Sequence, residues 1–233
     1  MAIRRWSVIL LGLIALLIQR PLEARPASSA ISDSQVCDPL ADYFLGMEDY
    51  PEAIRRHQAV IKQHPDNALA HYHLGFAEGV MGQHQLELSE YKKAVQLGLS
   101  DWDLFLNLGL LYLETDQLDT ATNVLQLATL LAPERPEAHY NLGIAYERRG
   151  KLKQAEQEML LSLRLDPAQV DARNQLGVIY AEEGNFPRAR DEWQEIAAAA
   201  PSYSPARQNL ALLRQAEQRH SPAAGQGSSP NAP

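Results

Sequence analysis

The sequence predicts an all-α protein, a solenoid of antiparallel helix pairs, because its 233 residues repeat with a period of 34. Leucine recurs at this spacing at Leu74, Leu108, Leu142, Leu176 and Leu210. Glycine follows the first four of these leucines, and two further slots repeat with the same period: Ala121, Ala155 and Ala189, then Pro133, Pro167 and Pro201. A period that continues without a gap over five copies is typical of stacked helical repeats.

Each unit of the period is expected to contain a helix, a turn, a second helix and a stop. Small residues such as Gly143 and Ala155 stand where two antiparallel helices must approach closely. The pairs Asp116-Gln117, Gly150-Lys151 and Gly184-Asn185 are turn signals between the two helices. The second helix is expected to end near a proline, because proline disfavours the helical conformation of the residue before it.

This pattern places five repeats and a capping helix in a helical array at 38–219. The repeats are expected at about 34–67, 68–101, 102–135, 136–169 and 170–203, and the capping helix at 204–219. The pair Asp38-Pro39 is a good N-cap and first helical residue, so the first helix is expected to start late. Glu87 replaces the alanine of the other repeats, and we expect its helix to pack less tightly.

The residues of two units carry a family resemblance. The segment from Tyr140 to Tyr146, followed by Gly150, Leu152, Ala155 and Pro167, resembles the tetratricopeptide repeat, and the segment 174–201 matches nearly as well. This resemblance implies a right-handed α-solenoid with a terminal solvating helix. It also implies that the first helix of each repeat lines a concave groove that holds extended or helical peptides.

Mapping that groove onto the chain gives an apolar stripe with a polar row beside it. The stripe consists of Tyr72, Leu106, Tyr140 and Asn174 in one row and Phe76, Leu110, Ile144 and Val178 in the other. The polar row is His73, Asn107, Asn141 and Gln175, whose side chains could bond a peptide backbone. Neighbour packing or self-association is the alternative role of these residues. The basic clamp that related proteins use for chaperone tails is not expected, because Asp38 and Asp42 occupy corresponding places.

The N-terminus is expected to be an export signal. Arg4 and Arg5 precede an apolar run, Val8 to Ile18, which is too short for a typical membrane span but typical of a secretory signal. Cleavage is expected after Ala24, which gives a leader at 1–24 and a flexible linker at 25–37; an uncleaved membrane anchor is the alternative. Both place the repeats outside the cytoplasm, either periplasmic or secreted or tethered to a membrane.

Composition argues against several other functions. The formal charge is −8, and it becomes −10 when the leader is removed with its three arginines and one glutamate, Arg4, Arg5, Arg20 and Glu23. Nucleic acid is therefore not expected as a partner. The only cysteine, Cys37, can form no internal disulfide, though an intermolecular one remains open. The tail 220–233, rich in Ser, Pro, Gly and Ala, is expected to be disordered.

No catalytic, metal or cofactor site is expected. His71 and His73 are the closest histidine pair, but residues two apart on a helix point to different sides. His84 replaces an apolar residue of other repeats and is expected to be half-buried. No nucleophile–base pair or phosphate loop is evident. The expected function is a non-catalytic scaffold that binds an apolar or amphipathic peptide of a protein partner. A self-associating structural protein and an assembly factor for an envelope complex, of pilus or secretion type, are the alternatives.

Overall fold

A computed structural model describes residues 38–220 of the protein, with side chains up to Glu217. The expected leader at 1–24, the linker at 25–37 with Cys37, and the tail beyond His220 lie outside the described residues. None of the helices in the described range combines the length and the apolar content needed to cross a bilayer.

Residues 38–220 form eleven helices and no strand, which confirms the all-α repeat fold. In chain order they are α2 (Pro39–Gly46), α3 (Tyr50–Gln63), α4 (Ala68–Val80), α5 (His84–Gln96), α6 (Trp102–Glu114), α7 (Leu118–Leu131), α8 (Pro136–Arg148), α9 (Leu152–Leu165), α10 (Val170–Glu182), α11 (Phe186–Ala199) and α12 (Ser204–His220).

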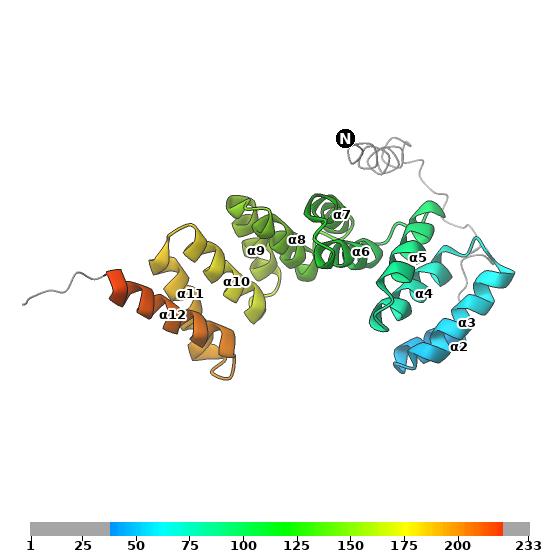
Figure 1. Ribbon diagram of the computed structural model, residues 1–233, viewed down its shortest axis with the longest axis horizontal. Coiled ribbons are helices and arrows are strands. Elements are labelled where there is room, and N and C mark those ends of the chain that lie inside the picture. Colours follow the sequence, from blue (N-terminus) through cyan, green and yellow to red (C-terminus); the bar gives the residue numbers. More distant parts are fainter. Residues whose placement is uncertain (1–37, 221–233) are drawn as a thin grey trace, which may run out of the picture. The chain divides into compact units, whose positions relative to one another are not determined.

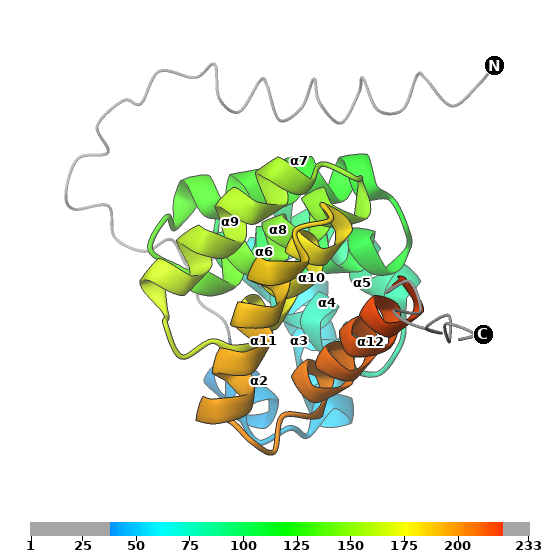
Figure 2. The ribbon, with the colours of Figure 1, turned by 90° about the vertical axis from the view of Figure 1, so that its left-hand side faces the viewer.

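The helices fall into two compact units that divide after Leu131. The first contains the pairs α2/α3, α4/α5 and α6/α7, and the second contains α8/α9 and α10/α11 with α12 beside α11 (Figures 1 and 2). The 34-residue period of the sequence continues unchanged across this division.

In the four pairs from α4/α5 to α10/α11, a large side chain of the second helix covers a glycine of the first. A Cβ atom at Gly143 would lie 2.8 Å from Cε of Met159, and one at Gly177 would lie 2.5 Å from Nε1 of Trp193. Real Cβ contacts are not that short, so any side chain at these positions would push the helices apart. The expected close approach at the period's small residues is therefore confirmed.

The turns inside the pairs form where the sequence predicts them. Gly150 and Gly184 have φ values of 70° and 76°, and Asp116 takes φ 58° in the equivalent turn of α6/α7. This left-handed backbone costs glycine little, whereas a side chain raises its energy. The first helix does start late, at Pro39, since the Asp38 carboxylate accepts a 3.0 Å hydrogen bond from the Leu40 backbone N–H.

The structure shows how Glu87 fits into the α4/α5 contact, where the sequence predicts looser packing. Glu87 is buried, and a Cβ atom on Gly79 would lie 2.5 Å from its Cδ. The carboxylate therefore occupies the space that a side chain at position 79 would fill. His84 was misplaced, because its ring is exposed and pairs with Glu87 and Glu114 instead of packing against neighbours.

Candidate functional site

The residues predicted to line the groove lie on the first helix of each pair. α4 carries Tyr72, His73 and Phe76, α6 carries Leu106, Asn107 and Leu110, α8 carries Tyr140, Asn141 and Ile144, and α10 carries Asn174, Gln175 and Val178. Leu110 is the most open of them at 38% exposure, and Tyr72 is buried at 8%. The other ten are partly buried.

Tyr72 joins two neighbouring pairs and is not an open groove residue. Its hydroxyl donates a 2.9 Å hydrogen bond to Asp103 and accepts one of 3.1 Å from the Asn107 amide. Burial, followed by the nearby Asp103 carboxylate, raises the pKa of Tyr72 above its usual value. The Tyr72 side chain therefore links α4 to α6 within the protein itself.

Several polar side chains of the predicted row also bond within the protein. His73 bonds Asp42 of α2 at 2.8 Å, and Asn141 donates to the Glu137 carbonyl of its own helix at 2.8 Å. Asn174 accepts a 3.2 Å hydrogen bond from Asn209 of α12. The contacts between helices favour the neighbour-packing role for Tyr72, His73, Asn107 and Asn174, whereas the Asn141 bond stays within α8.

A cavity of about 250 Å³ opens between α4, α5 and α6, which we call the α4–α6 pocket. Three predicted groove residues, Phe76, Asn107 and Leu110, lie in its wall. Its other lining residues are Gly79, Val80, His84, Glu87, Tyr91, Leu111 and Glu114. The predicted groove includes residues of the α4 and α6 walls but none of the α5 wall, because the sequence analysis considered only the first helix of each pair.

The pocket has an apolar wall and an acidic wall. Phe76, Val80 and Leu110 supply apolar surface, while Glu87 and Glu114 supply carboxylates. The His84 ring lies between these two, 3.1 Å from a Glu87 oxygen and 3.6 Å from a Glu114 oxygen. The Glu87 hydrogen bond raises the pKa of His84, with Glu114 adding to the effect. The arrangement suits a ligand that has both apolar and basic groups.

Glu78 adds a second buried carboxyl to α4, one residue before the pocket's Gly79. It stands in the slot that holds Tyr112, Tyr146 and Tyr180 in later repeats. Burial, and then the Glu90 and Glu87 carboxylates, raises the pKa of Glu78 to about 7. This region is therefore the place where the α4/α5 pair departs most from the repeat pattern.

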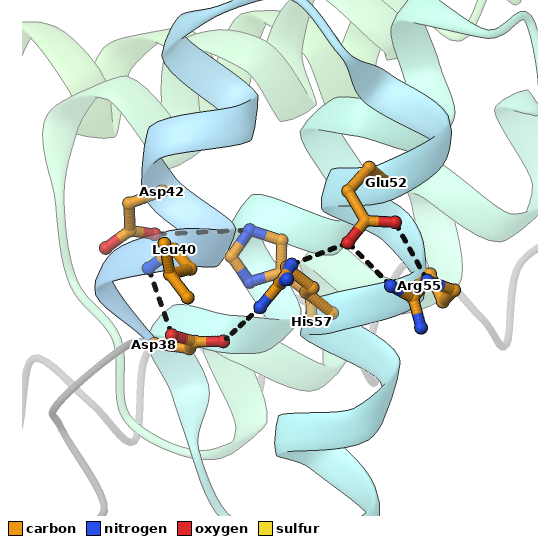
Figure 3. A network of polar contacts seen from close by, with 7 residues as sticks. Asp38, Leu40, Asp42, Glu52, Arg55 and His57 are labelled. Carbon is orange, nitrogen blue, oxygen red and sulfur yellow. Dashed lines mark hydrogen bonds and ion pairs between the residues drawn. The ribbon is translucent and has the colours of Figure 1, made fainter.

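A polar cluster joins α2, α3 and α4 at the start of the array. Asp42 of α2 points toward His57 of α3 in Figure 3, with Asp42 Oδ1 and His57 Nε2 4.0 Å apart. The same oxygen lies 2.8 Å from Nδ1 of His73. Burial, and then His73, lowers the pKa of His57 to about 4, although Asp42 and Asp38 oppose the change. Sequence reasoning missed this cluster because it compared histidines along one helix, whereas these come from two.

An ion-pair network lies beside the cluster at the α2/α3 contact (Figure 3). Arg56 bridges Glu52 at 2.6 Å and Asp38 at 3.6 Å, and Arg55 bonds Glu52 at 2.7 Å. Hydrogen bonds from Arg55 and then Arg56 lower the pKa of Glu52 to about 2. The network holds α2 against α3 close to His57.

A histidine–glutamate pair recurs at one slot of the repeat. His71 bonds Glu90 and the Pro65 carbonyl, and His139 bonds Glu158 and the Pro133 carbonyl. In α10/α11 the slot pair is Arg173 and Glu192, 3.2 Å apart, and in α6/α7 it is the buried apolar pair Phe105 and Val124. The two facing residues are either both polar or both apolar, which indicates a role in packing the two helices together.

Comparison with known proteins assigns the fold. Among solved structures, YrrB, described as a tetratricopeptide repeat protein with an unusual peptide-binding site, is 22% identical with a TM-score of 0.67, over 76% of this chain and 88% of its own. A MamA fragment from Desulfovibrio magneticus RS-1 is 21% identical with a TM-score of 0.66, and the match covers 70% of this chain and 93% of the fragment. A tetratricopeptide repeat protein from Parabacteroides merdae is 21% identical with a TM-score of 0.69, and the match covers 77% of this chain and 72% of that protein. At these identities the likeness concerns the fold.

The family assignment comes from the sequence match. Among curated proteins, none matches this chain. The tetratricopeptide repeat profile matches residues 39–100, 106–170 and 160–205, well over half of the chain. The helix pairs, the covered glycines and this match agree that the chain belongs to the tetratricopeptide repeat family, whose members are scaffolds for protein–protein interaction.

Proposed function

We propose that this protein is a non-catalytic scaffold outside the cytoplasm that captures an amphipathic peptide segment of a partner protein in the α4–α6 pocket. The observation that carries the proposal is the pocket itself, since three predicted groove residues and two carboxylates line it. YrrB, with the same fold, is described as having a peptide-binding site.

The chemistry of the pocket specifies the segment. An apolar side chain fits against Phe76, Val80 and Leu110, and a lysine or arginine beside it can pair with Glu114 and Glu87. Glu114 is exposed and so remains accessible to a partner. The Asn141 and Asn174 side-chain amides contribute less to peptide binding, because each already bonds within the second unit.

Selection from a displayed library of random peptides tests this proposal. We expect enriched peptides to combine an apolar residue with a nearby Lys or Arg. A synthetic copy of an enriched peptide is then titrated by calorimetry against the wild type and two variants, Leu110→Lys and Leu130→Lys. Leu110 lies in the pocket, whereas Leu130 of α7 is 71% exposed and is not among the residues that line it.

The two variants distinguish binding in the pocket from non-specific binding to exposed apolar surface. Leu110→Lys is expected to weaken binding about tenfold or more, because it removes apolar contact and places a cation beside the carboxylates. Leu130→Lys is expected to bind as the wild type does. Equal binding by wild type and Leu110→Lys, or equal losses in both variants, would contradict the proposal.

The setting outside the cytoplasm rests on the sequence of residues 1–24 and needs its own test. The protein is expressed with its native leader, cells are fractionated, and the N-terminus is sequenced. We expect a new N-terminus at Arg25 in the exported fraction. An intact Met1 in the membrane fraction would indicate a tethered scaffold, and full retention in the cytoplasm would contradict the extracytoplasmic setting.

Self-association is the second candidate function, and one surface of α2 favours it. Leu40 and Tyr43 of α2 and its C-cap residue Met47 are exposed at spacings of three and four, so they present an apolar stripe. Sedimentation at several concentrations distinguishes the two functions, because only self-association raises the mass with concentration. A constant monomer mass would remove this candidate.

A further inference from the structure

Three potential metal ligands meet where α2, α3 and α4 pack together. Asp42, His57 and His73 come one from each helix, and their ligand atoms all lie within 4.8 Å of one another. The two imidazole rings contact each other edge to face, with centroids 5.3 Å apart. Asp42 and His57, which lie 31 and 16 residues before His73 in the sequence, are thus brought beside it by packing.

The repeat pattern itself does not require polar residues at these positions. Counted by the period of 34, the equivalents of His57 are the buried residues Tyr91, Leu125, Met159 and Trp193. The equivalents of Asp42 are Phe76, Leu110, Ile144 and Val178. All four later repeats have apolar or aromatic side chains at both slots. In the first repeat a histidine and an aspartate therefore replace two apolar residues, and a second histidine, His73 of the next repeat, faces them.

We propose that Asp42, His57 and His73 bind a divalent transition-metal ion, best matched by zinc, which ties α2 to α3 and α4. Two imidazole nitrogens and one carboxylate oxygen are ligands that zinc accepts, whereas magnesium and calcium prefer oxygen ligands alone.

The distances require only small side-chain movements. Zinc bonds of about 2.0–2.2 Å place two ligand atoms of a tetrahedral site about 3.4 Å apart. Asp42 Oδ1 lies 2.8 Å from His73 Nδ1 and 4.0 Å from His57 Nε2, so the first separation widens and the second shortens on binding. His57 is fully buried, which limits its ring to small movements.

The site can be reached from solvent on one side. The Asp42 side chain is 41% exposed and that of His73 is 20% exposed. A water molecule can therefore complete the four ligands at the Asp42 side. Because α2 contributes only eight helical residues, an ion held between it and two longer helices fixes its position more firmly than its own contacts do.

The first test measures binding by the protein prepared without a histidine tag. Zinc is titrated by calorimetry, and cobalt is added as a spectroscopic probe, because a four-coordinate cobalt site absorbs visible light more strongly than the hydrated ion. We expect one zinc ion per chain and a visible cobalt spectrum. Absence of either would overturn the proposal.

Ligand variants locate the site. Asp42→Asn keeps the shape of the side chain, and His73→Asn keeps a smaller polar side chain. Each is expected to weaken zinc binding by about tenfold or more. His84→Asn is the matched control, because His84 also pairs with a carboxylate, Glu87, but lies outside the cluster. Circular dichroism checks that all three variants are folded. Wild-type zinc affinity in both ligand variants, or loss in the control alone, would overturn the proposal.

Hydrogen exchange tests the role of the ion. If zinc binds only when α2 is docked, free zinc at about a hundredfold above its Kd slows exchange of the α2 amides by about a hundredfold. Exchange in α11 is expected to remain unchanged. Unchanged hydrogen exchange in α2 with zinc bound would contradict the proposal that the ion holds α2 against α3 and α4.

Discussion

The α4/α5 and α8/α9 pairs share one backbone plan but differ in the chemistry of their contact. Each closes over a glycine, Gly75 beneath Tyr91 in the first pair and Gly143 beneath Met159 in the second. In α8/α9 the next contact slots hold the buried residues Tyr146 and Ala155. In α4/α5 the same slots hold Glu78 and Glu87, which are also buried.

The difference shows how a slot of the period can change without loss of the helix pair. Gly79 leaves the space into which the Glu87 carboxylate fits, whereas its equivalent in α8 is Glu147. A change at one slot is thus matched by a change at the slot it faces. The matched pair opens the acidic wall of the α4–α6 pocket, which we regard as the functional part of the first unit.

The largest expected effect comes from placing the α4/α5 chemistry into α8/α9. Ala155→Glu puts a carboxylate where Ala155 has no exposed surface and no glycine makes room for it. We expect a loss of about 3 kcal/mol or more in the free energy of unfolding, measured with urea. The exposed Ala198→Glu in α11 is the control. Similar losses in the two variants would contradict the comparison.

Neutralising Glu78 tests the cost of the second buried carboxyl. Its folded-state pKa of about 7 lies above its ordinary value of 4.5, so the folded protein holds the proton more tightly and loses stability as the pH rises between these values. Glu78→Gln does not titrate, so we expect it to be about 2 kcal/mol more stable than wild type at pH 8 and to lose this advantage below pH 4.5.

Urea unfolding at pH 4, 6 and 8 measures this difference. The exposed Glu134→Gln is the control and is expected to follow the wild type at each pH. A Glu78→Gln advantage that is constant with pH, or absent at pH 8, would contradict the raised pKa.

A double-mutant cycle tests the match between Gly79 and Glu87. Gly79→Ala alone is expected to destabilise the protein by about 1 kcal/mol, because the new Cβ clashes with the carboxylate. In a Glu87→Ala background the same change is expected to stabilise by about 0.5–1 kcal/mol, since alanine is the better helix residue. Additive effects in the cycle would show that the two positions do not depend on each other.

The smallest expected effects concern the turns. Asp116 takes a left-handed backbone in α6/α7, where α8/α9 has Gly150. We expect Asp116→Gly to stabilise by up to about 1 kcal/mol and Gly150→Ala to destabilise by about 1 kcal/mol. Thermal unfolding measures both. Destabilisation by Asp116→Gly would mean that the aspartate side chain contributes more than its backbone conformation costs.

Much of the fold was predictable because the period fixes where helices meet. Leu142, Gly143 and Ala155 stand at their slots for steric reasons that one chain reveals by repetition. The turn at Asp116 and the late start at Pro39 follow from local backbone chemistry in the same way. The division after Leu131 has no such signal, because the period continues across it.

The candidate sites were less predictable because they combine slots on different helices. The rows of the predicted groove include Phe76 and Leu110, which line the pocket, but they gave no sign that Tyr72 bonds Asp103. His57 could have been noticed as a polar residue in an apolar slot. Its meeting with His73 depends on the packing of α3 against α4, which spacing along one helix does not show.

The most direct test of the central claim is to map where a selected peptide binds. Amide hydrogen exchange is measured on the protein with and without a saturating peptide obtained from the displayed library. The account predicts slower exchange in α4, α5 and α6, and no such slowing when Leu110→Lys replaces the wild type. Protection confined to α8–α12, or to α2, would contradict the assignment of the α4–α6 pocket as the binding site.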